Sequence, residues 1–367
     1  MKQKALCITT LLIAALSFTA CYPTGEVSNS DEIKQYVTEA PTNNSQTADD
    51  ESLNVEEHTN TELKNVKLSL DYPQSPEKIP EINSHFQKWD NEKAKLVFLE
   101  GKGDIIEESH ESDLNPEEMR YVYDIPGEYR LIMESGRLSY SYRGNSNRDE
   151  YTVLQSSWSM EEMDKIFGHE ELEGFSSQDA VKKVTDILDE CGINEYGTPI
   201  IYPLHADIVN KYFQENFSDF AKKDGTIYSV NWTQEEEAYL IVFPQTAGDI
   251  TYSLSTTSLD AIVTRDGITE LSISNWNDKS TTINNNQNLV YSSTDATNIL
   301  INYYESAILD YPVELLNCQL TMYPESETGE FPIHYIPTWE FTEKVQVDET
   351  RFYIERTNIN AITGKIV

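Results

Sequence analysis

The chain carries the pattern Ser-Ser-x-Asp-Ala twice, at Ser176–Ala180 and at Ser292–Ala296. A serine followed three residues later by an acidic residue is typical of a helix N-terminus, because both side chains can pair with free backbone N–H groups. Apolar residues then recur at helical spacing, up to Cys191 after the first start and up to Ala307 after the second. Each start therefore predicts an amphipathic helix with one buried face.

Strands are predicted after both helices, and the two sets end alike. They are expected at residues 239–243, 250–254, 259–263 and 268–274 after the first helix, and at 314–323, 336–341, 351–357 and 359–367 after the second. Gly267 and Gly364 mark comparable turns, each before a last short apolar pair, and the first set contains an extra helix over His205–Phe217. A helix on a curled antiparallel sheet, present twice, predicts α+β units at residues 171–275 and 290–367.

Residues 65–170 are predicted to form a β-rich domain. Strands are expected at 66–72, 95–100, 119–124, 128–134, 138–143 and 151–155, followed by a helix over Met160–Phe167. Alternation of apolar and polar residues in several of them is typical of antiparallel strands with one buried face. The fold class is therefore α+β, with antiparallel sheets, helices on one face and two repeated units after the β-rich region.

The first residues predict export. A basic start, an apolar run over Ala5–Phe18 and a small residue at Ala20 are typical of a secretory signal over residues 1–20. Cys21 follows at once and resembles the acylated cysteine of bacterial lipoproteins, although Phe18 stands where such signals usually carry leucine, so ordinary secretion is the alternative. Residues 21–64 are polar and without period, which predicts a disordered tether. We expect lipid anchoring at Cys21 on the extracellular face of the cell membrane.

Charge narrows the range of partners. Lys and Arg number 27 against 63 Asp and Glu, for a net charge of −36. Nucleic acid is excluded as an expected partner, because its phosphates would be repelled. The same charge repels anionic lipid headgroups, so membrane attachment is expected through the acyl chains alone.

Two cysteines lie in the expected folded part, Cys191 and Cys318. An exported protein permits a disulfide between them. Each also falls in register with apolar neighbours, as a small buried thiol would. The residues leave both states open.

The search for catalytic or metal-binding motifs returns none. The six histidines include no pair at i, i+4, and the His169–Glu171 turn is better explained as a solvated polar cluster. No Gly-x-Ser-x-Gly occurs, and Gly101–Gly103 lacks the rest of a phosphate loop. We therefore expect no enzyme, with no catalytic, metal-binding or cofactor-binding residue and no cofactor.

The aromatic residues can belong either to the core or to an exposed surface that stacks on a ligand. Trp339 alternates with Phe341 as core residues do, so both are predicted to be buried. Tyr303–Tyr304 and Tyr121–Tyr123 are the candidates for an exposed surface that stacks on a ligand.

One resemblance to a known family is carried by Ile336–Phe341 and Ile359–Ile366. This ending resembles PepSY-type and YycI-like extracellular domains, whose units are likened to half a cystatin; Ala261–Ile268 is a weaker match in the first unit. The whole layout is similar to uncharacterised lipoproteins of Gram-positive bacteria. The resemblance implies a non-enzymatic extracytoplasmic module, in some relatives a peptidase inhibitor or a regulator of a sensor kinase.

Two functions are consistent with these features. The first is a binding or regulatory module for a peptide or an envelope protein, engaged through sheet edges or the groove between units. The alternative is a solute- or glycan-binding lipoprotein that serves uptake. That alternative fits less well, because the chain lacks the alternating βα pattern of two-lobed binding proteins.

Overall fold

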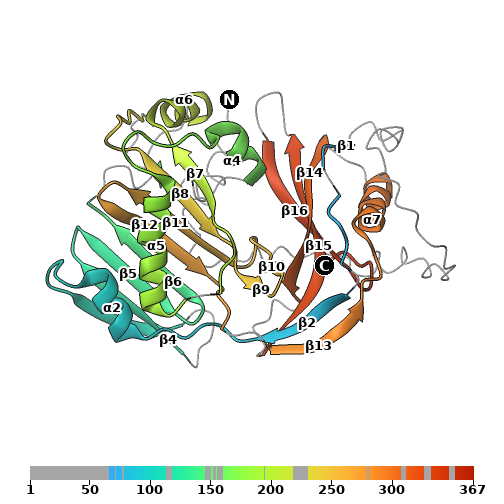
Figure 1. The fold of residues 1–367 in the computed structure, drawn as a ribbon, viewed down its shortest axis with the longest axis horizontal. Coiled ribbons are helices and arrows are strands. Elements are labelled where there is room, and N and C mark those ends of the chain that lie inside the picture. The colour runs from blue at the N-terminus through green and yellow to red at the C-terminus, as the bar shows by residue number, and fades with distance from the viewer. Residues whose placement is uncertain are drawn as a thin grey trace, which may run out of the picture.

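The structure is a computed structural model that describes residues 66–70, 72–76, 78–112, 118–144, 150, 151, 154, 160–193, 195–217, 230–278, 281–306, 311–325, 332–346 and 352–367. The expected signal segment, Cys21 and the tether lie outside the described residues. The fold is α+β with two sheets of mainly antiparallel strands, as the sequence predicted (Figure 1).

Sheet 1 has eight strands, and every neighbouring pair in it is antiparallel. In spatial order they are β3 (Ile106–Glu111), β4 (Met119–Ile125), β5 (Tyr129–Glu134), β6 (Arg137–Tyr142), β12 (Gly267–Ser274), β11 (Ser258–Thr264), β8 (Ala238–Phe243) and β7 (Ile200–Leu204).

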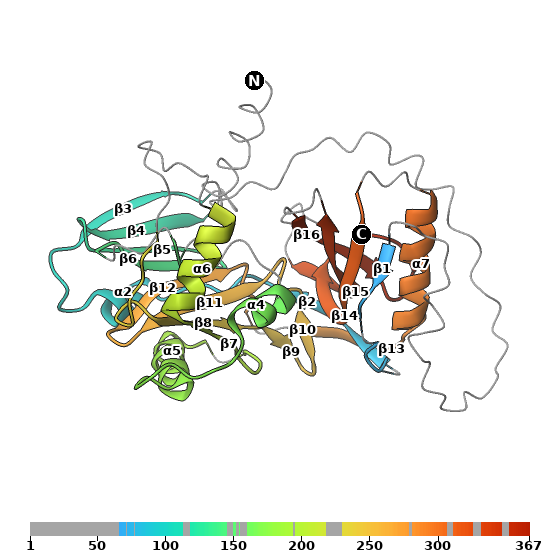
Figure 2. The same cartoon turned by 90° about the horizontal axis from the view of Figure 1, so that it is seen from above.

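Helices cover both faces of sheet 1, and Figure 2 shows α5 and α6 on opposite sides. On one face lie α2 (Asn91–Leu99) and α5 (Ser177–Cys191), whose buried residues share a core with the inward residues of β8 and β11. On the other lie α4 (Met160–Phe167) and α6 (Ala206–Phe217). This second helical layer is a feature that the sequence did not predict.

Sheet 2 is also eight-stranded and contains the chain's C-terminal strands. Its path is β13 (Thr281–Asn288), β2 (Lys78–Ser84), β15 (Ile333–Gln346), β14 (Val313–Pro324), β10 (Ile250–Tyr252) and β9 (Thr246–Ala247), with β1 (Val66–Leu68) beside β14 and β16 (Phe352–Asn360) beside β15. The pairs β1–β14 and β10–β14 are parallel, and the others are antiparallel. One face packs against α7 (Ser293–Ser306).

The repeat predicted from the two helix starts is present in the topology. After α5 the chain forms the antiparallel series β7, β8, β11 and β12; after α7 it forms β14, β15, β16 and a bridge at Ile366. Gly267 is the first residue of β12, the fourth member of the first series, and Gly364 lies between β16 and the bridge at Ile366; both have positive φ. Both helices also begin alike, because Ser176 Oγ accepts from Asp179 N and Ser292 Oγ accepts from Asp295 N, each at 3.1 Å.

Strand pairing crosses the residue ranges expected for the domains. From the 65–170 range, β1 and β2 belong to sheet 2 whereas β3 to β6 belong to sheet 1. From the 171–275 range, β9 and β10 belong to sheet 2. The division into domains by residue range stays a prediction.

Three local predictions are wrong. Residues 95–99 of the strand expected at 95–100 belong to helix α2, which Asp90 caps by accepting from Lys93 N and in which Ala94 and Phe98 are buried one turn apart. Tyr151, expected in a strand, is helical, as are Glu150 and Leu154. The expected final strand 359–367 is divided, because β16 ends at Asn360 and a turn brings Ile366 back beside Ile359.

Candidate binding site

The segment that joins α4 to α5, residues 168–176, lies against the end of sheet 1 near β7 and β8. The hydroxyl of Tyr239, from β8, anchors it by accepting a hydrogen bond from Leu172 N at 2.9 Å. The same hydroxyl lies 2.6 Å from Glu171 Oε2 and 2.9 Å from the carbonyl of Phe175, so its proton is donated to one of these acceptors. One tyrosine therefore determines the path of the segment.

Glu171 connects this segment to the start of α5. Its carboxylate accepts from Ser177 N at 2.6 Å and from Ser177 Oγ at 2.5 Å. The hydrogen bonds from the side chains of Ser177 and Tyr239 lower the pKa of Glu171, whereas burial raises the pKa of Tyr239. The site thus holds a carboxylate, charged at neutral pH, beside a neutral phenol.

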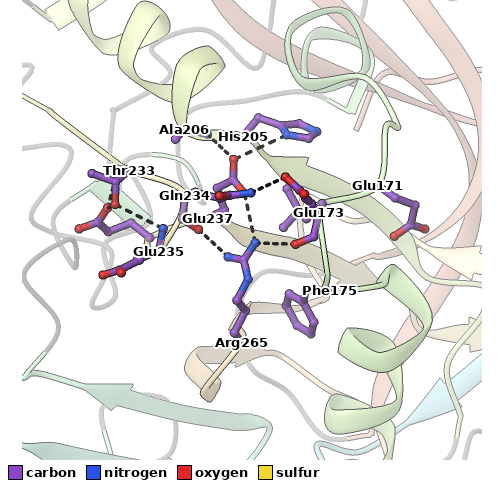
Figure 3. Close-up of polar contacts among 12 residues, drawn as sticks. Glu171, Glu173, Phe175, His205, Ala206, Thr233, Gln234, Glu235, Glu237 and Arg265 are labelled. Atoms are coloured by element: carbon purple, nitrogen blue, oxygen red, sulfur yellow. Dashed lines mark hydrogen bonds and ion pairs between the residues drawn. The ribbon is translucent and has the colours of Figure 1, made fainter.

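Arg265 gathers three parts of the chain around one guanidinium group (Figure 3). It stands in the turn between β11 and β12 and donates to the carbonyl of Gln234 at 2.6 Å and to that of Glu173 at 3.0 Å. It also pairs with Glu237 at 3.3 Å. Glu237 in turn accepts from Ala206 N, at the start of α6, at 3.3 Å. Because backbone carbonyls take part of its donor capacity, Arg265 fixes the loops more than it presents a free charge.

Two hollows lie on either side of this braced segment. The first, here called the basic pocket, has a volume of about 430 Å³ and lies between α5 and the β11–β12 turn. It is lined by Gly174, Phe175, Asp179, Lys182, Lys183, Asp186 and Arg265. The second, the mixed pocket, has a volume of about 390 Å³ and is lined by His169, Glu171, Ser177, Pro199, Ile200, Ile201, Pro203 and Tyr239.

The chemistry of these linings suits recognition. In the mixed pocket the Ser177 hydroxyl donates to a carboxylate, and His169 lies 3.4 Å from Asp164 and stacks over Tyr202. In the described part of the chain, the Ser177 hydroxyl is hydrogen-bonded to Glu171 and not to a histidine. Within the described ranges, no cluster of three or more His, Cys, Asp or Glu side chains is arranged to hold a metal ion.

The aromatic candidates from the sequence divide between core and surface. Trp339 and Phe341 are fully buried in the core under α7, as predicted. Tyr303 is 48% exposed, but Tyr304 is buried and donates to Glu343. Tyr123 is buried as well, so the prediction of an exposed pair at Tyr121 and Tyr123 is wrong for Tyr123. The structure does not bring Tyr303 and Tyr121 into one surface: they belong to α7 and β4, against different sheets.

Cys191, Cys318, Lys102 and Cys21 are the other residues that the sequence analysis named. Cys191 and Cys318 are free thiols, the first half-buried and the second buried, and burial raises the pKa of Cys191 to about 11 and of Cys318 to about 12. Lys102, of the Gly-Lys-Gly turn, donates to Tyr140 Oη at 2.7 Å. Cys21, the lipidation candidate, is outside the described residues. Among the helices that are described, none combines the length and the apolar character that crossing a membrane requires.

Sequence reasoning missed Arg265, Tyr239 and the two lysines of the basic pocket. Tyr239 reads as an ordinary strand residue, and Lys182 and Lys183 read as the solvated face of a helix. Only the pairing of β8 with β11, and the packing of α5 on both, brings them together. The chain offers no local motif for such a site.

Comparison with known proteins gives similarity of fold alone. No known protein family matches the chain, and no curated protein matches it. An uncharacterised protein from Eubacterium rectale has a similar structure, with a TM-score of 0.58 and 11% identity over 84% of this chain and 92% of its own. The C-terminal domain of Bacillus megaterium YpeB aligns over 77% of this chain and 96% of its own with 11% identity. Its TM-score of 0.31 is too low to support a shared fold.

Proposed function

We propose that this protein is a non-enzymatic binding or regulatory module, anchored by lipid outside the cell membrane, for a peptide or an envelope protein. The observation that carries this proposal is the pair of pockets on the two sides of the segment 168–176. Their linings combine ionic, hydroxyl and apolar groups on a braced backbone, which is what a preformed recognition site requires. The signal-like start, Cys21 and the resemblance of the C-terminal unit to PepSY-type domains support the location and the class.

The mixed pocket suits an extended peptide. It is lined by Pro199, Ile200, Ile201 and Pro203, in and just before β7, and β7 ends sheet 1. Apolar side chains beside a hydroxyl and a carboxylate are typical of pockets that take alternate side chains of a bound strand. The strongly acidic composition favours a partner with basic residues.

Site-specific photo-crosslinking in living cells tests the proposal. A photoreactive residue at His169 or at Lys182 is at the exposed rim of the mixed or the basic pocket, and one at Tyr353, on β16, is a control of comparable exposure. We expect one envelope protein or peptide to be trapped from both pocket positions and not from Tyr353. Equal trapping from all three positions would contradict a dedicated site.

A second arm addresses anchoring and chemistry. Cells that express Cys21→Ser should lose the palmitate label that wild-type cells incorporate, and equal labelling would contradict lipidation.

The purified full-length protein should show no hydrolysis across panels of glycans and peptides. Turnover of a defined substrate that is lost on mutation of one carboxylate pair would replace the binding module with an enzyme, and tight capture of a free glycan would favour the uptake alternative.

A further inference from the structure

The basic pocket is an exception on an acidic chain. Three of its lining side chains are cationic, Lys182, Lys183 and Arg265, and two are anionic, Asp179 and Asp186. The lining therefore has one net positive charge, although acids outnumber bases by 63 to 27 in the whole chain.

Lys183 is the cation of this pocket with donors to spare. Its ammonium group donates to the backbone carbonyl of Arg265 at 2.8 Å and lies 5.4 Å from the centre of the Phe175 ring. No carboxylate of the described chain is within ion-pair distance of it. An ammonium group has three donors, so the described contact leaves Lys183 able to donate to a ligand.

The neighbouring cations are held in different ways. Lys182 is neutralised by Asp186, with contacts of 2.7 and 2.6 Å, on the solvent-exposed face of α5. Arg265 uses its two terminal nitrogens for the carbonyls of Gln234 and Glu173 and for Glu237. Arg265 therefore positions the loops around the pocket, and Lys183 is the cation that can donate to a ligand.

We propose that the basic pocket binds a single carboxylate group of the peptide or protein partner, with Lys183 as its main contact. This inference rests on the proposed function and names the chemistry that one of its pockets recognises. A carboxylate is favoured over a phosphate, because Lys182 pairs with Asp186 and Arg265 with Glu237, which leaves the one positive charge of Lys183 to balance one negative charge. The Phe175 ring supplies an apolar wall for the carbon chain that bears the carboxylate.

Titration of the isotope-labelled full-length protein in detergent, followed by nuclear magnetic resonance, tests the inference at constant ionic strength. N-acetylglycine represents a peptide C-terminus, N-acetylglutamic acid amidated at its α-carboxyl represents an acidic side chain, and N-acetylglycinamide is the uncharged control. We expect saturable shifts of the Gly174 and Phe175 amide signals with at least one carboxylate probe and none with the control. The probe that binds more tightly identifies whether the source is a terminus or a side chain.

Matched variants locate the contact. Lys183→Gln should weaken binding by at least about tenfold, which corresponds to the loss of one charge-assisted hydrogen bond. Lys183→Arg should retain it, and Lys88→Gln, which removes an exposed lysine paired with Glu118 elsewhere, should leave it unchanged.

Several results would overturn the inference. These are the absence of saturable shifts, equal binding by Lys183→Gln with an unchanged backbone spectrum, or tighter binding of inorganic phosphate than of either carboxylate. Photo-crosslinking at His169 and Lys182 distinguishes a failure of the carboxylate inference from a failure of the proposed function. A partner trapped there, together with carboxylate probes that do not bind, would leave the binding module standing and remove only the ligand chemistry.

Discussion

Trp339 shows how one residue joins the two parts of the C-terminal unit. Its ring is fully buried between β15 and α7, and its indole N–H donates to the carbonyl of Tyr291, just before α7, at 2.8 Å. The same side chain therefore fills the core and satisfies a backbone group next to the helix start. Burial of Trp339 and Phe341 was predicted from alternation alone and is confirmed.

Trp339→Ala should lower the free energy of unfolding by about 3 to 5 kcal/mol, because truncation of a buried aromatic residue leaves a cavity. Chemical denaturation of the purified protein measures this. Trp339→Phe is the control: it retains most of the buried area and loses the hydrogen bond, for a cost of about 1 kcal/mol. A Trp339→Ala protein with wild-type stability would mean that this face is not the core.

Asp260 gives the stability of the protein a dependence on pH. It lies half-buried in β11, between Val242 of β8 and Ser272 of β12, neither of which is charged. Burial raises its pKa to about 7. In the unfolded chain an aspartate has a pKa of about 3.9, so the folded state binds more protons between these values and stability falls as the pH rises through that interval.

Asp260→Asn should therefore gain stability relative to wild type as the pH rises from about 4 to 7, by as much as about 4 kcal/mol. Below pH 4 the two proteins should differ little. Denaturation at a series of pH values gives the difference, and the carboxyl carbon shift of Asp260 reports its pKa directly. A measured pKa near 4 would contradict the expectation.

Long-range contacts explain which residues the sequence could not reveal. Tyr304 follows the exposed Tyr303 in α7, yet it is buried because its hydroxyl donates to Glu343, in β15. Arg265 lies in a turn, where sequence patterns suggest solvent, and it is instead tied to loops at residues 173 and 234. In both cases the partner is distant in the chain, so no local pattern encodes it.

At the level of elements, the two helix starts share the same serine cap. Ser176 and Ser292 each accept from the N–H group three residues on, and each hydroxyl also contacts the acidic side chain at that position, Asp179 at 2.7 Å and Asp295 at 2.6 Å. At the second start, Ser292 N also donates to Asp295 Oδ2 at 3.0 Å, and the shared sequence pattern with the apolar spacing after it made both helices predictable.

Ser176→Ala and Ser292→Ala should each cost about 1 kcal/mol of stability, since each leaves a helix N-terminus without its cap. Thr185→Ala, on the solvent side of α5, is the control and should change stability by less than about 0.5 kcal/mol. Thermal denaturation compares the three. A cost confined to one of the serines would show that the two starts are not energetically equivalent.

Elements with local signals were predicted, and elements defined by distant partners were not. Helices α5, α6 and α7 follow their caps and periodicity closely. Strand β2 was not predicted, because it is defined by pairing with β13, about 200 residues later, and with β15, about 250 residues later. Helix α2 was mistaken for a strand, since its short apolar run outweighed the cap at Asp90.

The whole molecule is held together where the chain passes from one sheet to the other. It does so from β2 to β3, from β8 to β9, from β10 to β11 and from β12 to β13. Two of these passages meet at a buried polar network. Gln245 and Asn277 exchange hydrogen bonds of 2.7, 3.0 and 3.2 Å, and Tyr335 of sheet 2 donates to Asn277 at 2.9 Å.

Asn277→Ala removes the two buried hydrogen bonds that the Asn277 side chain makes, with Gln245 Oε1 and with the Tyr335 hydroxyl, whereas the bonds between the Gln245 side chain and the backbone of residue 277 remain. Asn277→Ala should therefore cost about 2 to 4 kcal/mol, whereas Tyr335→Phe, which removes a single hydroxyl, should cost about 1 kcal/mol. Hydrogen exchange tests whether the effect reaches both sheets. We expect Asn277→Ala to raise amide exchange in β8 of sheet 1 and in β15 of sheet 2 together, because the network restrains both. Faster exchange confined to residues next to position 277 would mean that the network is a local contact and that the sheets are coupled by other means.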